Sequence, residues 1–219
     1  MQANADDGGP WNDASVTEPK AVAERIDVVV PGVWTWSIED DRLGGFTSTS
    51  YAVATEGGTV LIDPLPVEDE AFGELGDIEA ICLTTSNHQR SSWRLRRALG
   101  VEVHAPALAK EIEEEPDNRY SEGDSLPAGL RPVFTPGAGT TQHTLLLDRD
   151  GGIAFVPDPL LLMSDGDLVL VPEEYAHDTA EARRSVEKLL ELPFSILCVA
   201  HGGAITEAPK DRIRAALET

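Results

Sequence analysis

Four side chains suited to acid–base chemistry or metal binding occur where short apolar runs stop. Asp63 follows the run at residues 60–62, Asp158 follows 153–156, His201 follows 196–200, and His88 lies in the polar stretch after 78–83. Imidazole and carboxylate groups exchange protons and are common ligands of zinc, iron and manganese. Because side chains at strand ends tend to converge in loops that carry function, the pattern predicts a shared site.

The elements that would position these residues follow from short-range patterns. Residues 47–55 and 59–62 flank Glu56-Gly57-Gly58, which predicts a β-hairpin that ends at Asp63. Residues 78–83, 91–99, 101–104 and 106–114 alternate between strand and helix patterns, which predicts adjacent parallel strands. Further strands are expected at residues 27–30, 33–38, 130–134, 144–147, 153–156, 168–171 and 194–200. Helices are expected at 179–192, with Asp178 as N-cap, and at 209–217.

These elements form two strand-rich halves, each with its own helices. The pattern predicts an α+β fold, a four-layer αββα sandwich, in which residues 21–219 form one domain. The alternative is a mixed α+β domain without that symmetry. Residues 1–20 are expected to be a flexible acidic leader, because residues 1–15 are rich in Asp, Asn and Gly. They lack the basic start and apolar centre of a secretory signal.

The charge balance limits the classes of partner. The chain has 219 residues, with 17 basic and 39 acidic side chains and a net charge of −22. Such a surface repels nucleic acid and anionic membranes. Only four residues are lysine, and an acidic, lysine-poor surface resembles that of proteins from salt-loving microbes. Salt adaptation is one interpretation of the charge, and a cationic partner or substrate is the other.

Two cysteines, Cys82 and Cys198, lie inside apolar runs and are expected in the core rather than in a disulfide. A reducing cytoplasm is therefore the expected location. No apolar stretch approaches the roughly 20 residues that a membrane helix needs. His104, His143 and His177 are interpreted as structural or exposed residues.

The order of the landmarks resembles the metallo-β-lactamase superfamily, from about residue 29 to the C-terminus. In that family a hairpin ends in Asp, a strand ends in a His-x-His-x-Asp-His loop, a Thr-Pro-Gly-His loop follows, and two later strands end in Gly-Asp and in His. Here Asp63, Asp158 and His201 stand at the expected places, and Thr135-Pro136-Gly137 matches the second loop.

Five of the seven metal ligands implied by the resemblance are replaced, and Asp158 and His201 remain. The replacements are Thr85 and Asn87 for the first two His, Gln89 for Asp, Arg90 for the last His of that loop, and Ala138 for the His after Thr-Pro-Gly. Neutral amides and hydroxyls are weak zinc ligands, and an arginine stays protonated and repels a cation. No cofactor is therefore expected. If a metal binds, it is a single zinc, iron or manganese ion held by His88, Asp158 and His201.

The charges suggest two roles for Arg90. A bidentate pair between Arg90 and Asp158 would close the former metal pocket with internal hydrogen bonds. If Asp158 is engaged elsewhere, Arg90 is expected to hold an anionic group of a substrate. His88 has two interpretations as well: it caps the following helix, or its imidazole serves as acid, base or ligand.

Three functions remain open at this point. One is a hydrolase with one metal or none, in which His88 and His201 act as acid and base, Arg90 and Asp158 complete the catalytic group, and Asp63, Thr85, Asn87, Gln89 and Ala138 line the pocket. Thr85 and Ser86 are the nearest nucleophile candidates. The second is a binding or scaffold protein that kept the fold and lost the chemistry. The third is partner binding through the acidic surface. The substrate and the oligomeric state do not follow from the sequence.

Overall fold

The computed structural model describes residues 18–40, 43 and 46–219, and its main features are two β-sheets that pack face to face. The first sheet has seven strands in chain order: β1 (Asp27–Val30), β2 (Val33–Glu39), β3 (Thr47–Ala54), β4 (Thr59–Ile62), β5 (Ile78–Cys82), β6 (Glu102–Pro106) and β7 (Asn118–Tyr120). The second has the order β14 (Gly203–Ile205), β13 (Ile196–Val199), β10 (Ile153–Val156), β9 (His143–Leu147) and β8 (Arg131–Phe134). A separate hairpin joins β11 (Leu160–Leu162) to β12 (Leu168–Leu170).

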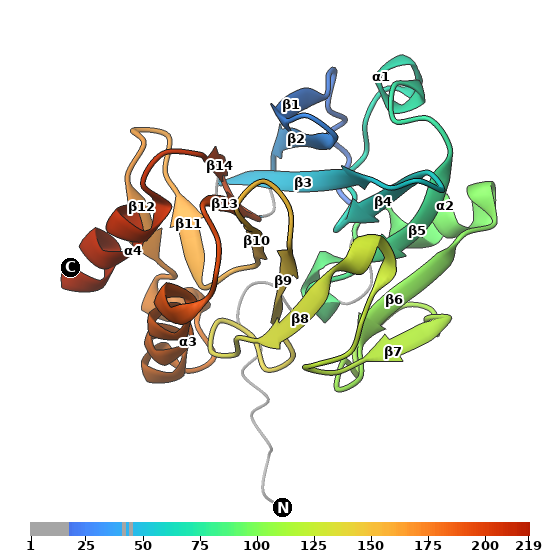
Figure 1. Cartoon of the computed structure of the whole chain (residues 1–219). Coiled ribbons are helices and arrows are strands. Elements are labelled where there is room, and N and C mark those ends of the chain that lie inside the picture. Colours follow the sequence, from blue (N-terminus) through green and yellow to red (C-terminus); the bar gives the residue numbers. More distant parts are fainter. Residues whose placement is uncertain (1–17, 41–42, 44–45) are drawn as a thin grey trace, which may run out of the picture.

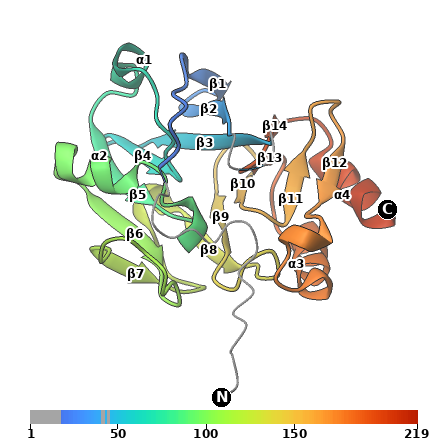
Figure 2. The same cartoon turned by 180° about the vertical axis from the view of Figure 1, so that it is seen from behind.

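Helices cover the outer face of each sheet, and Figures 1 and 2 show the two groups at opposite sides of the molecule. The first group is α1 (Asp69–Gly73) and α2 (Ser92–Leu99), and the second is α3 (Thr179–Glu191) and α4 (Pro209–Glu218). The expected αββα sandwich is confirmed. None of the helices in the described part of the chain has the length and apolar character needed to cross a bilayer.

Alternation along the strands explains the layers, since successive strand residues face opposite sides of a sheet. In β4, Val60 and Ile62 join the cluster between the sheets, whereas Leu61 joins the cluster under α2. In β10, Phe155 faces the space between the sheets and Ala154 faces α3 and α4. Both faces are buried, so these strands appear in the sequence as continuous apolar runs.

Parallel pairing places the site loops together. β4, β5, β6 and β7 pair in parallel, as do β10 and β13. The predicted hairpin is β3–β4, with Ala54 opposite Thr59. The carboxyl ends of β4 and β5 therefore lie at the same end of the first sheet, and those of β10 and β13 lie at the same end of the second.

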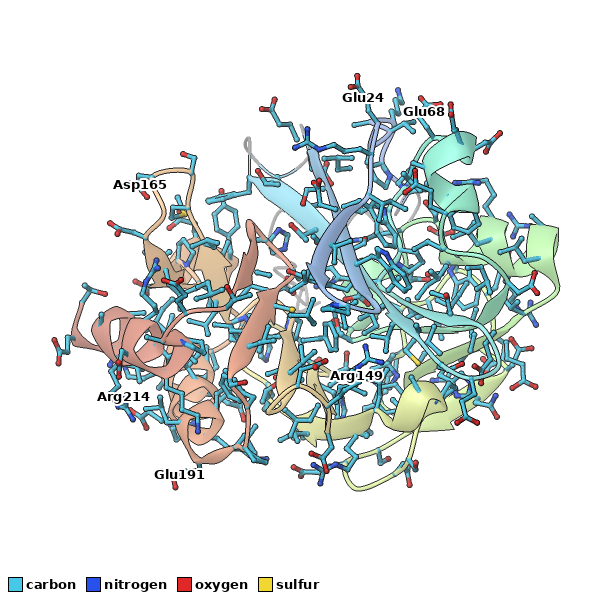
Figure 3. The ribbon with its side chains drawn as sticks, turned by 45° about the horizontal axis from the view of Figure 1, so that its top comes forward. Glu24, Glu68, Arg149, Asp165, Glu191 and Arg214 are labelled. Atoms are coloured by element: carbon cyan, nitrogen blue, oxygen red, sulfur yellow. The ribbon has the colours of Figure 1, made fainter. Side chains whose placement is uncertain are left out.

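Direct hydrogen bonds hold the two sheets in register. The Tyr51 hydroxyl donates to the carbonyl of Val199 at 2.8 Å, and the Thr49 amide donates to Ala200 at 2.8 Å. Arg149, which is labelled in Figure 3, donates to the carbonyls of Ala54 and Gly32 and so ties the second sheet to the first.

One predicted helix is wrong. Residues 106–114 form the end of β6 and irregular turns, not a helix. Their backbone groups are used by distant side chains: Arg119 binds the carbonyl of Ala109, and the Gln89 amide binds the carbonyl of Glu111 and the N–H of Glu113. An acidic run at 111–115 also disfavours a helix through like-charge repulsion. The leader expected at residues 1–20 lies, up to residue 17, outside the described residues.

Candidate functional site

The candidate site lies where the two sheets present their strand ends to each other. Asp63 follows β4, and His88 ends the short 3-10 helix η2 (Ser86–His88) after β5. Asp158 follows β10, and His201 follows β13. An isolated antiparallel β-bridge between Ser48 of β3 and His201 joins the backbone of the first sheet to the loop that follows β13. The four residues that the sequence singled out are thus brought together.

His88 is the centre of the group. Its Nδ1 lies 3.0 Å from Asp63 Oδ2, and its Nε2 lies 2.9 Å from Asp158 Oδ1. The ring is buried and engaged on both sides, so the helix-cap interpretation is wrong and the side chain belongs to the site. Burial lowers the pKa of His88, but the carboxylates of Asp158 and Asp63 outweigh burial, and the net pKa lies above its ordinary value.

Asp158 is shared by both imidazoles. Its Oδ1 also lies 3.0 Å from Nε2 of His201, and the two histidine rings are 5.6 Å apart at their centroids. Burial opposes ionisation of Asp158, yet His88 and His201 hold the pKa of this carboxyl well below its usual range. The pKa of His201 is lowered, chiefly by burial, which Asp158 offsets only in part. Asp158 is therefore an anion between two imidazoles.

Asp63 is held on every side. Its amide donates to Cys82, and its carbonyl accepts from the Ser50 hydroxyl at 2.5 Å. Its carboxylate accepts from the Thr84 amide at 2.7 Å, the Thr84 hydroxyl at 2.5 Å and His88. The backbone φ of Asp63 is +47°, a left-handed conformation that aspartate tolerates better than most residues. This fixation orients His88.

Arg90 is buried, and its Nη1 donates to the carbonyls of Thr49 at 2.7 Å and Asp63 at 3.0 Å. The predicted bidentate pair with Asp158 is wrong, because the Asp158 oxygens are engaged by His88, His201 and Gln142. The guanidinium is still near enough to lower the pKa of both histidines. Arg90 thus supports the strand ends and adds a fixed positive charge beside the site.

The other replaced ligands have local contacts. The Thr85 hydroxyl accepts from the Asn87 amide at the start of η2, and the Asn87 side chain is exposed. Gln89 accepts from the Trp93 indole N–H and donates to the carbonyl of Ser86. Ala138 packs with Leu161 and Ala182 in an apolar cluster. The structure places none of these side chains on the His88–Asp158–His201 group.

Two residues of the site were missed by the sequence reasoning. Thr84 binds Asp63 as described, and Gln142 donates from Nε2 to Asp158 Oδ2. Both are polar residues next to loops already singled out, but a buried amide or hydroxyl has no local signature that separates it from an exposed one. Only the docking of the two sheets brings Gln142 to Asp158.

Three donor atoms suit a single cation. His88, Asp158 and His201 each offer one donor atom, and these three atoms lie within 4.8 Å of one another; Nε2 of both histidines faces Oδ1 of Asp158. Metal–nitrogen and metal–oxygen bonds of about 2.1 Å need donors roughly 3.4 Å apart, so small side-chain shifts suffice. Asp63 on Nδ1 of His88 supplies the outer carboxylate typical of metal-ligating histidines. The donor set fits one divalent ion. It does not fit two, because Ala138 offers no ligand and Arg90 adds positive charge.

Comparison with known proteins agrees with the fold. The model of the metallo-beta-lactamase superfamily matches residues 27–219, and the chain belongs to this superfamily. A metallo-beta-lactamase from Pontibacter korlensis is 15% identical, with a TM-score of 0.72, and the match covers 89% of this chain and 99% of that one. The DIM-1 metallo-beta-lactamase is 16% identical, with a TM-score of 0.71, over 90% of this chain and 99% of that one. A metallo-beta-lactamase from Erythrobacter litoralis is 17% identical, with a TM-score of 0.66, over 88% of this chain and 91% of that one. No curated protein matches the chain. At these identities the likeness to solved structures shows the fold alone.

Proposed function

We propose that this protein is a hydrolase that works with a single divalent metal ion held by His88, Asp158 and His201. The observation that carries the proposal is the convergence of two imidazole Nε2 atoms on one carboxylate oxygen, with Asp63 fixing the far side of His88. Two histidines and one carboxylate form a ligand set used for zinc in hydrolases and for iron in oxygenases. When bound, the ion would activate water and polarise a substrate carbonyl or phosphoryl oxygen.

The residues of the chain prepare this chemistry. Asp63 holds the Nδ1 proton of His88, so the lone pair of Nε2 can face the ion. Arg90 supplies a fixed cation near the histidines, where a second metal ion would otherwise balance negative charge on a substrate. We propose a small molecule as the substrate.

Metal analysis tests the proposal directly. Protein purified without chelator is expected to contain close to one equivalent of zinc, iron or manganese, and His201→Ala is expected to lose it. His177→Ala is the matched control, because the His177 side chain is exposed and is not one of the three residues whose donor atoms converge. A panel of esters, lactones, thioesters and phosphodiesters then identifies the reaction.

The competing function is a binding protein without catalysis. The observation in its favour is that Gln89, Arg90 and Ala138 have all taken structural contacts. Absence of metal from the purified wild-type protein, together with inactivity on the panel, would favour this alternative and overturn the proposed metal-dependent hydrolase.

The surroundings in which the protein works are a separate proposal. The excess of acidic over basic residues and the four lysines support a protein that works at high salt. Cys82 and Cys198 are buried free thiols, which supports a reducing cytoplasm.

A further inference from the structure

Gln142 is a buried amide that touches the site from the second sheet. It precedes β9, and its side chain is fully buried. Its side-chain Nε2 donates to Asp158 Oδ2, and its main-chain carbonyl accepts from the main-chain amide of Thr135 at 3.0 Å. The side-chain Oε1 has no hydrogen-bond partner among the described residues. A buried glutamine normally satisfies both ends, so this one is held for its contact with Asp158.

The two oxygens of Asp158 have separate partners. Oδ1 faces the Nε2 atoms of His88 and His201, and Oδ2 faces the amide of Gln142. A carboxylate that is free to rotate could offer either oxygen, or both, to a cation. The Gln142 N–H donor limits this freedom, because it holds the carboxylate with Oδ1 toward the imidazoles. The NH₂ group, with the positive end of its dipole toward Oδ2, also occupies the place from which a second cation would approach that oxygen.

Packing prevents Gln142 from turning away. A Cβ placed on Gly139 would lie 3.2 Å from Gln142 Nε2 and 3.3 Å from its Cγ, so the loop backbone lies directly against the amide. The backbone bond to Thr135 fixes the base of the side chain. The amide therefore acts as a fixed donor.

We propose that Gln142 is a positioning residue that reserves Asp158 Oδ1 for the metal ion and keeps Oδ2 from a second ion. This inference rests on the proposed function, since it concerns the same three ligands. It assigns to Gln142 the part that Asp63 has for His88, namely an outer contact that fixes which atom of a ligand faces the ion.

Cobalt binding tests the inference. Cobalt(II) replaces zinc in such sites, and its visible spectrum reports the ligand geometry. The wild-type protein is expected to bind one equivalent. Gln142→Leu is expected to bind cobalt 10- to 100-fold more weakly, the range typical for loss of an outer contact, and with an altered spectrum. Thr144→Val, two residues along the chain from Gln142, is the matched control. It removes the buried hydrogen bond between the hydroxyls of Thr144 and Thr135 and leaves Asp158 untouched. Its affinity and spectrum are expected to match those of the wild type.

Further outcomes separate this inference from the proposed function. A folded Gln142→Leu protein with wild-type cobalt affinity and spectrum overturns the inference and leaves the metal site intact. So does wild-type protein that binds two equivalents. If the wild type binds no cobalt, the proposed function fails, and nitrogen-15 NMR of the histidine rings decides the positioning role. Shifts at Nε2 of His88 and His201 in Gln142→Leu but not in Thr144→Val support it, and unchanged shifts overturn it. Gln142→Met, which keeps the approximate size but has neither a hydrogen-bond donor nor a charge, replaces the leucine variant if that protein does not fold.

Discussion

Asp63→Asn is the most informative substitution outside the proposed metal ligands. The change keeps the size of the side chain, and asparagine tolerates the left-handed backbone of Asp63 at φ +47°. Backbone strain is therefore unchanged, which would not hold for alanine. What changes is the hydrogen-bonding capacity, because an oxygen that accepts from its neighbours becomes an NH₂ group that donates.

The magnitude follows from the contacts of the carboxylate. Oδ1 accepts from the Thr84 amide, and Oδ2 accepts from the Thr84 hydroxyl and faces His88 Nδ1. The asparagine oxygen must stay on the backbone amide of Thr84, which cannot turn away, so the NH₂ group faces His88. The neutral ring avoids two opposed donors by moving its proton to Nε2, which is the atom needed for the metal. Loss of such an outer carboxylate lowers metal affinity by about 10- to 100-fold, or about 1.4–2.8 kcal/mol.

Zinc titration of the purified variant, with a competing chelator, measures this loss. Thr84→Val is the control, because it removes one bond to Asp63 and leaves the acceptor for His88 Nδ1 in place. Its affinity is expected to stay within a few-fold of the wild type. Equal zinc affinity in Asp63→Asn and the wild type would refute the argument that Asp63 selects the tautomer of His88.

Two further predictions concern stability. The net charge of −22 predicts that the free energy of unfolding, measured by urea titration, rises between 0.1 and 2 M potassium chloride, and no change would contradict salt adaptation. At Asp117, the bond from Arg96, with a smaller contribution from the Val103 amide, lowers the pKa to about 2 from its ordinary value of 3.8. Because the folded pKa is the lower one, this stabilisation is present above pH 4 and is lost as the pH falls toward 2. Asp117→Asn is therefore expected to cost about 1 kcal/mol at pH 7, after allowance for solvent screening, and less at pH 3; an equal cost at both would contradict this assignment.

Much of the fold could be predicted from the sequence, because its landmarks are local. The glycine turn at 56–58 sets the β3–β4 hairpin, and continuous apolar runs mark the strands that are buried on both faces. The predicted helix at 106–114 fails because its backbone groups bind side chains that are distant in sequence. Propensity does not include such contacts.

The composition of the site could be predicted in part. Asp63, Asp158 and His201 are recognisable by their places at strand ends, and His88 by its position in the polar loop. The contacts of Arg90 could not be predicted. Charge alone favoured a pair with Asp158, whereas in the folded chain Nη1 of Arg90 donates to the backbone carbonyls of Thr49 and Asp63. Gln142 was missed for the related reason that its partner lies on another loop.

The shared Asp158 oxygen has a consequence for the dynamics of the molecule. His88 comes from the first sheet, whereas Asp158 and His201 come from the second, so the site exists only while both halves are docked. Such long-range contacts form late in folding, after the loops between them have closed. A ligand that needs the complete site would therefore suppress openings that separate the sheets, and would slow amide hydrogen exchange in β4, β5, β10 and β13 together. Occupancy of the site would therefore stabilise the docking of the two sheets against each other.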